Sequence, residues 1–391
     1  MKFIATDIDL SNLLQLESVV NTLQPDVKLE NLNSYLYYSR PRQTLYLLVK
    51  GSIAYARLEV KAQVNTDTSI GLMISSNNLT RFVDCYTPEM RSKIILTIEV
   101  KGESSTYGFT GNNDKINFPH LVLSTSEMKE LNSLIDVIEE PINSNLFYLD
   151  TVSESGKEVI ESFSKCLSFI DEDVRNNAIA IYPNKTMASD SRHVYIYNLQ
   201  NTLNVTEPII LHKKIAKVFI DLVSKQAQPI MTIEGSKVKI ISNTLSFGTI
   251  LNNGIANISP PSEEDLKFLH PHKLISEVPV TELNNLLSFF MNFYSNKVNY
   301  KTITIEVVEQ GLNFVIKDSG IVGYNSSHVE RLYTLPVEES GIVCTLLIES
   351  LRSFVQCLNK NNKIYMYMDN EHPAVVMISE NQEIYLAKPK G

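Results

Sequence analysis

The chain has 391 residues, 43% of them hydrophobic and 20% charged, a balance that is typical of folded globular proteins and excludes an intrinsically disordered chain. No apolar run approaches the ~20 residues of a membrane-spanning helix, and the opening MKFIATDIDL acquires acidic residues too early for a signal peptide. The formal net charge of −9 disfavours any binding mode that depends on overall positive charge, but it does not say where the basic residues lie.

Helical periodicity, with apolar residues every three or four positions, occurs in six places along the chain. The segments expected to be helical are Leu10–Leu23, Leu79–Tyr86, Val159–Ile170, Ile215–Val223, Leu283–Phe290 and Leu347–Leu358. Most other segments alternate apolar and polar residues or are rich in β-branched residues, as in TLYLLVKGSIAYARLEV and TITIEVVEQGLNFVIKDSG. Turns that contain Gly or Asn join several of these runs, which predicts β-hairpins.

The six helices fall into three pairs. The second helices of the pairs begin near Leu79, Lys213 and Cys344, at intervals of about 130 residues, which indicates a threefold repeat. We therefore expect three α+β domains, each an antiparallel β-sheet with two helices on one face. The predicted boundaries are 1–123 for the first domain, 146–268 for the second and 269–391 for the third.

An additional segment precedes the second domain. Residues 124–145, STSEMKELNSLIDVIEEPINSN, have the pattern of a short amphipathic helix that stops before Pro141. We interpret the segment as a linker or strap. A plain interdomain connection and a functional insert are the two alternatives that the sequence leaves open.

The stretch ASDSRHVYIYN, residues 188–198, gathers residue types used in nucleophilic catalysis. One interpretation makes Ser189 or Ser191 a nucleophile with His193 as its base. Neighbours on an extended chain point to opposite faces, however, and neither a Gly-x-Ser-x-Gly turn nor a third group accompanies them. The stretch is therefore better interpreted as the polar rim of a binding site, and we expect no enzymatic activity.

Metal and nucleotide motifs are not found in the sequence. The four cysteines lie far apart, no HExxH pattern occurs, and no GxxxxGK[ST] phosphate loop is present. We therefore expect reduced cysteines in the core, no metal and no cofactor.

Several stretches, taken in order, carry a more specific pattern. They are MKF before a Leu-rich helix, NLTRFVDCYTPEMRSKIILTIEVKGE, INFPHL, and DEDVRNNAIAI followed by ASDSRHVYIYN. Together they resemble a bacterial-type DNA sliding clamp, the beta subunit of replicative DNA polymerase, over essentially the whole chain. The resemblance implies a non-catalytic accessory subunit whose three clamp domains form half of a closed ring around duplex DNA.

The resemblance also implies a groove between the second and third domains that binds short peptides of partner proteins. By position, its residues are Ala178, Ser189, Ser191, Arg192, His193, Val194, Ser259, Pro260, Leu386, Lys388 and Pro389. The chain departs from the family pattern here, with Ser-Arg-His for Gly-His-Arg, Ala178 for a Leu, and a Lys-Pro-Lys-Gly ending for Met-Pro-Met-Arg-Leu. We expect a groove with less apolar wall and more positive charge, which favours more acidic peptides and suits a phage-encoded clamp.

Basic residues on the solvent-facing stripes of the helices are the expected contacts with DNA phosphates. The candidates are Arg81, Lys157, Lys165, Arg175, Lys213, Lys214, Lys217, Lys225, Lys297 and Arg352. The alternative for each is an ordinary solvated helix face.

The partners implied by the resemblance are double-stranded DNA bound without sequence preference, a DNA polymerase, an ATP-driven clamp loader and a second copy in a head-to-tail homodimer. The expected location is the cytoplasm of a bacterial cell or a phage-infected host, without membrane attachment. The remaining alternative is a non-enzymatic β-rich assembly or virion protein that has the same repeat but does not encircle DNA.

Overall fold

The computed structural model of the chain describes residues 2–5, 10–23, 32–60, 63–64, 67–74, 95–99, 106–111, 114–119, 121–140, 147–170, 178–190, 192–225, 228–242, 247–251, 261–271, 273–294, 301–317 and 328–388. Internal contacts divide the chain into two units. Unit 1 comprises residues 1–156 and 217–255, and unit 2 comprises residues 157–216 and 256–391.

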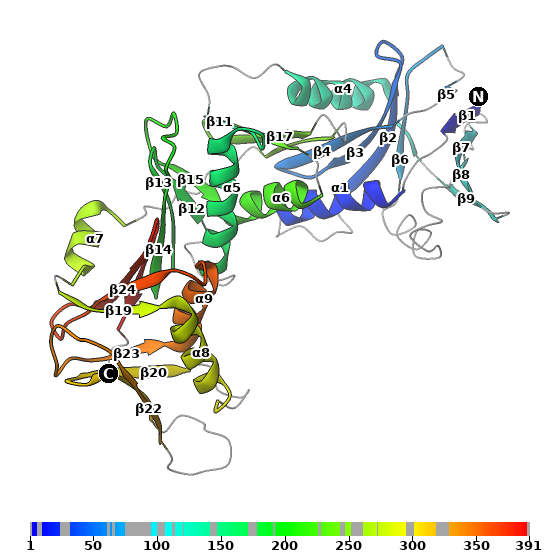
Figure 1. The fold of residues 1–391 in the computed structure, drawn as a ribbon. Helices are drawn as coiled ribbons and strands as arrows, with labels where there is room; N and C mark the ends of the chain where they lie inside the picture. The colour runs from blue at the N-terminus through cyan, green and yellow to red at the C-terminus, as the bar shows by residue number, and fades with distance from the viewer. Residues whose placement is uncertain are drawn as a thin grey trace. The chain divides into compact units, whose positions relative to one another are not determined.

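Unit 1 is built on a nine-stranded antiparallel sheet (Figure 1). Its strands, in spatial order, are β10 (Leu121–Val122), β6 (Ile70–Ile74), β2 (Asn33–Ser39), β3 (Thr44–Lys50), β4 (Ala54–Val60), β18 (Phe247–Leu251), β17 (Lys237–Ser242), β16 (Ile230–Glu234) and β11 (Phe147–Leu149). At the pairing of β4 with β18, the Thr249 hydroxyl donates to the Tyr55 carbonyl oxygen at 2.9 Å, between residues 194 positions apart in sequence. The sheet therefore joins strands from two distant parts of the chain.

A second, five-stranded antiparallel sheet belongs to the same unit. Its spatial order is β5 (Gln63–Val64), β1 (Lys2–Ala5), β7 (Ile95–Glu99), β8 (Thr106–Gly111) and β9 (Asp114–Pro119). Within the described residues, β9 pairs only with β8 and ends the sheet.

Helices cover both faces of the nine-stranded sheet (Figure 1). Helix α1 (Leu10–Leu23) contacts β3 and β4, and its buried Glu17 accepts a hydrogen bond of 2.6 Å from the Ser34 hydroxyl of β2. Helix α4 (Thr125–Glu139) packs on the opposite face of the sheet. Its apolar side chains contact Tyr37, which lies three positions after Ser34 on β2 and therefore points to the other face. The interior of unit 1 thus has a helical layer on each side of one sheet.

Unit 2 is built on an eight-stranded antiparallel sheet and a four-stranded one. The larger sheet has the order β15 (Ile209–His212), β12 (Ala178–Ile181), β13 (Lys185–Ser189), β14 (His193–Asn198), β26 (Gln382–Ala387), β25 (Ala374–Ser379), β24 (Lys363–Tyr367) and β19 (Leu274–Pro279). The smaller sheet has the order β22 (His328–Thr334), β21 (Gly311–Lys317), β20 (Thr302–Val308) and β23 (Val343–Leu347).

Most predicted helices occur where the periodicity placed them. Helix α1 has the predicted bounds, and α4 lies within the segment 124–145 that was expected to be helical. The other predicted helices that the structure describes are α5 (Glu154–Cys166) with the 3-10 turn η2 (Leu167–Phe169), α6 (Lys213–Ser224), α8 (Val280–Met291) and α9 (Ile348–Cys357). The predicted helix at 79–86 lies outside the described residues. Helix α7 (Glu263–Leu269) was not predicted. The α+β class is confirmed, and the three domain boundaries remain predictions.

Candidate partner groove and DNA-facing residues

The predicted groove residues of the middle and the end of the chain meet at one strand pair. Strand β14 pairs with β26 in antiparallel register, so that His193 lies opposite Leu386 and Val194 opposite Tyr385. Beyond the ladder, the Ala387 amide donates to the Arg192 carbonyl oxygen at 2.9 Å. The structure therefore brings Arg192, His193, Val194 and Leu386 together, as the predicted groove requires.

An aspartate shapes the turn that leads into β14. One carboxylate oxygen of Asp190 accepts from the backbone amides of Arg192 at 2.7 Å and His193 at 2.8 Å, and it lies 3.2 Å from Nδ1 of His193. Nε2 of His193 lies 2.9 Å from the Phe169 carbonyl oxygen, and because a carbonyl oxygen only accepts, this nitrogen carries a proton. The described contacts of the imidazole are therefore structural, with Phe169 and Asp190.

The same kind of turn recurs on the other side of β26. Asp369 accepts from the amides of Glu371 at 2.9 Å and His372 at 2.7 Å, and its second oxygen lies 2.6 Å from Nδ1 of His372. In the sheet, β26 lies between β14 and β25, so an Asp-x-x-His turn flanks the end of β26 on each side. These two turns fix the backbone on both sides of the C-terminal end of β26, within the predicted groove.

Replacing Asp190 with Ala is expected to loosen this turn. The change removes the acceptor of two backbone amides and a side chain that is itself only 5% exposed, so we expect a loss of about 1–3 kcal/mol in the free energy of unfolding. Asp190→Asn, which keeps an oxygen acceptor, serves as the matched control. Urea titration checks the stability, and hydrogen exchange at the Arg192 and His193 amides checks the turn. Equal losses in both variants would contradict the proposed role of the acceptor.

An apolar wall adjoins these turns and includes a residue that sequence reasoning missed. The predicted groove residues Ala178 and Val194 are 8% and 7% exposed. They pack in one cluster with Leu266 of α7 and with Tyr385 of β26. The signal for α7 was present in the sequence, because Ser262 and Asp265 form a capping box and Leu266 and Leu269 lie three positions apart. We add Leu266 to the candidate groove.

Of the two basic residues predicted to make the groove more positive, Arg192 and Lys388, one is engaged in contacts with the backbone. The Lys388 ammonium donates to the Asp369 carbonyl oxygen, and the Lys388 amide donates to the Pro373 carbonyl oxygen at 2.9 Å. Both contacts attach Lys388 to the segment that leads into β25. Arg192 is exposed and Ser189 is half-buried at the end of β13. The expected gain of positive charge therefore rests on Arg192 in the described part of the groove. Ser191, Ser259, Pro260 and Pro389 lie outside the described residues.

The basic candidates for DNA contact differ in how much of their charge solvent can reach. On α6, Lys217 is exposed opposite a buried stripe of Ile215, Phe219 and Leu222, as predicted, and Lys225 just after the helix is exposed as well. Lys213 and Lys214 are half-buried beside His212, whose pKa is lowered by burial and by these two ammonium groups. Arg81, Arg175 and Lys297 lie outside the described residues.

The candidates on the other helices show three different environments. On α5, Lys157 is exposed, whereas Lys165 pairs with Glu161 at 2.7 Å and lies over the ring of Tyr197. On α9, Arg352 is half-buried, and among the residues that the structure describes its Nε has no hydrogen-bond partner.

Neither a metal site nor a membrane-spanning helix is found among the described residues. No group of three or more His, Cys, Asp or Glu side chains is placed to hold an ion there. None of the described helices is long and apolar enough to cross a membrane.

Comparisons with known proteins gave structural matches only. No family model and no curated protein matches the sequence. The DNA polymerase sliding clamp of Pseudomonas aeruginosa superposes with a TM-score of 0.70 at 12% identity, and that of Caulobacter crescentus with 0.74 at 11%. The Helicobacter pylori beta clamp bound to a DNA ligase peptide superposes with 0.69 at 11%. Each match covers 100% of both chains. The chain therefore has the α+β fold of the bacterial DNA sliding clamps.

Proposed function

We propose that the chain is a DNA sliding clamp, a non-catalytic processivity factor that encircles duplex DNA and tethers a replicative polymerase. The observation that carries the proposal is the full-length fold match, because the shared fold extends over the whole of each clamp rather than over one domain. A closed ring holds DNA by topology, so an acidic chain needs only weak phosphate contacts. Such contacts permit sliding, whereas contacts with base edges would stall it.

The DNA-facing surface is proposed to be the solvent side of the helices. Lys157, Lys217 and Lys225 are exposed there, and the half-buried Arg352 of α9 is a further candidate. These side chains would contact phosphates without reading the base sequence, as sliding requires. Loading onto DNA would require an ATP-driven clamp loader, because the sequence has no phosphate-binding loop.

Ring closure is proposed to occur through a head-to-tail homodimer. The strands proposed for it are β9 in unit 1 and β22 in unit 2, each of which ends its sheet among the described residues. Pairing β9 of one copy with β22 of another would satisfy both edges and would repeat at a second, identical contact. Leu332 on β22 is 43% exposed and would be covered by such a contact.

Partner proteins are proposed to bind the groove beside β14 and β26. The ligase peptide on the Helicobacter clamp supports a peptide-binding role for this fold. Here the turns at Asp190 and Asp369 fix the backbone, while Val194, Leu266 and Tyr385 supply an apolar anchor site. The exposed Arg192 favours peptides with an acidic residue near the anchor.

Retention on DNA of different topology tests the proposal directly. The chain is loaded by a compatible clamp loader onto a nicked circular duplex, and half of the sample is then linearised. We expect retention on the circle and rapid loss from the linear DNA. A ring held by topology slides off a free DNA end, whereas a protein held by direct contacts stays bound. Equal retention on both forms would indicate ordinary binding and would overturn the proposal. Loading of a known clamp in parallel controls for loader activity.

A further inference from the structure

Helix α4, the segment expected to be a linker or strap, lies over the place where the two halves of the nine-stranded sheet join. One half consists of β10 and the strands between residues 33 and 74, and the other of strands between residues 147 and 251. They meet only where β4 pairs with β18, from Leu58 opposite Phe247 to Ala54 opposite Leu251. We call this five-residue pairing the seam.

The apolar side of α4 is anchored on both sides of the seam. Leu131 and Ile135 are 3% and 0% exposed and pack in a cluster with Tyr37, Tyr46 and other residues of β2 and β3. One turn further along, Ile138 is 0% exposed and packs against Tyr55 of β4. The same side chain touches the other half at Gly248 of β18, where an added Cβ would lie 2.3 Å from Cγ2 of Ile138. A glycine at this point of the seam allows the helix to approach.

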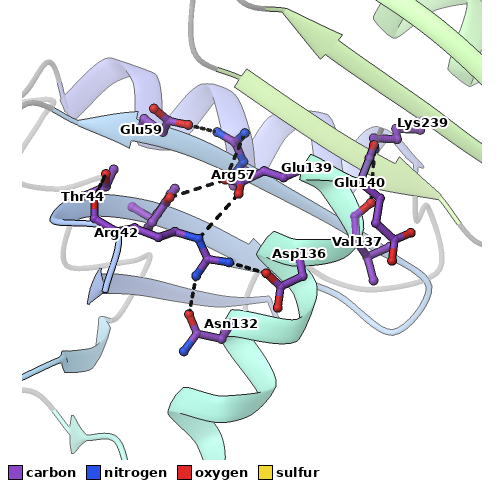
Figure 2. Close-up of polar contacts among 11 residues, drawn as sticks. Arg42, Thr44, Arg57, Glu59, Asn132, Asp136, Val137, Glu139, Glu140 and Lys239 are labelled. Atoms are coloured by element: carbon purple, nitrogen blue, oxygen red, sulfur yellow. Dashed lines mark hydrogen bonds and ion pairs between the residues drawn. The ribbon is translucent and has the colours of Figure 1, made fainter. Parts of the chain in front are cut away.

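Polar side chains also connect α4 to both halves of the sheet (Figure 2). From the first half, Arg42 donates to Asp136 and, at 2.7 Å, to Asn132, while Arg57 of β4 lies 3.4 Å from the Glu139 carboxylate. The Arg57 side chain is only 8% exposed, so its pairing with Glu139 and with Glu59 at 2.8 Å offsets the cost of burying a guanidinium.

The second half of the sheet contributes Lys239 of β17. Its ammonium donates to the carbonyl oxygens of Val137 at 3.2 Å and Glu140 at 2.8 Å. These carbonyls lie at the C-terminal end of α4, where helix carbonyls lack intrahelical donors and the helix dipole favours a cation. Burial lowers the pKa of Lys239, while the nearby Glu140 carboxylate acts in the opposite direction. A partly desolvated lysine therefore caps the helix across the seam.

We propose that α4 is a clasp that holds the seam closed and makes the two half-sheets one rigid body. The clasp is anchored to one half by Arg42, Arg57 and the apolar cluster and to the other by Gly248 and Lys239. If the ring of the proposed function forms, the clasp directs its opening to the contact between copies rather than to the interior of the chain. The clasp itself does not depend on that function.

Hydrogen exchange of the full-length protein, without DNA or loader, tests the clasp. In Gly248→Ala the new methyl group meets Ile138 and must lift the end of α4, so amides of both α4 and the seam strands, residues 54–60 and 247–251, should exchange about tenfold faster or more. Adding Ile138→Ala removes the clashing Cγ2 atom and should restore a large part of the protection at the seam. This rescue distinguishes an effect through α4 from direct damage to β18.

Lysine variants on one strand provide a matched comparison. Lys239→Met removes the cap and should accelerate exchange at the seam several-fold, whereas Lys237→Met, two positions away on β17 and exposed, should leave it unchanged. The proposal is overturned if α4 exchanges faster in Gly248→Ala or Lys239→Met while the seam keeps its protection, because the seam would then hold without the helix. That outcome would leave the DNA retention experiment unaffected, so the two proposals can fail separately.

Discussion

Replacing Leu332 with Asp is expected to abolish retention on circular DNA while leaving the single chain folded. Leu332 lies on β22, the terminal strand of the four-stranded sheet, and is 43% exposed. A contact with another copy would bury the new carboxylate without a partner. We expect the self-association constant to fall by about 100-fold or more, which corresponds to about 2.7 kcal/mol. Analytical ultracentrifugation measures the association, and the circular-DNA assay measures retention.

The opposite edge of the same sheet supplies the control for this variant. Val343 on β23 is also exposed, at 53%, and β23 is the other terminal strand of the sheet. Val343→Asp makes the same chemical change and should alter neither association nor retention. If both variants behaved alike, β22 would not be the closing edge, and another terminal strand would have to be considered.

The second large effect is expected for Phe169→Ala, in the core behind the candidate groove. Phe169 is 1% exposed, and its ring stacks on Tyr195 at 4.3 Å between centroids and meets the His193 ring edge-on at 5.5 Å. Truncation leaves a cavity that the packed strands cannot fill. We expect the free energy of unfolding to fall by about 3–5 kcal/mol, measured by chemical denaturation of the full chain.

Binding of partner peptides should weaken in the same variant, because the Phe169 ring supports both His193 and the strand behind it. Phe268→Ala is the matched control, since Phe268 of α7 is 72% exposed and loses little on truncation. A change in stability of similar size in both variants would show that the Phe169 ring does not support this wall.

The helices could be predicted from the sequence because their apolar stripes are local. Helix α1 has the predicted bounds of Leu10–Leu23, and α6 buries Ile215, Phe219 and Leu222 as its pattern indicated. Helix α7 was missed because its seven residues offer a periodicity search only one apolar pair at helical spacing, Leu266 and Leu269. Its capping box was the stronger signal.

The candidate groove was predictable only through the resemblance. Residues 193 and 386 are paired across β14 and β26, and no local pattern links segments so far apart. The resemblance placed Arg192, Val194 and Leu386 at one site, where the structure does bring them together. It could not show that the Lys388 ammonium donates to a backbone carbonyl, because that contact depends on the turn at Asp369.

The docking of α4 was beyond sequence reasoning for a similar reason. Its amphipathic pattern predicted a helix, and the structure confirms one at Thr125–Glu139. Its anchors Arg42, Arg57 and Lys239 come from three different places in the sequence, and none of them carries a motif. A segment left open as a plain linker is therefore a packed layer of unit 1.

Both large sheets are completed by strands that are synthesised far apart in time. The Tyr55 carbonyl oxygen of β4 accepts a hydrogen bond from the Thr249 hydroxyl of β18, 194 positions later. The Tyr195 hydroxyl of β14 donates to the side-chain oxygen of Gln382 in β26, 187 positions later. After β4 or β14 has been synthesised, the ribosome must add more than 180 residues before the neighbouring strand, β18 or β26, exists. During that interval each strand presents an open hydrogen-bonding edge to other nascent chains. Productive folding in the cell should therefore depend on translation speed and on shelter by chaperones more strongly than the stability of the finished protein would suggest.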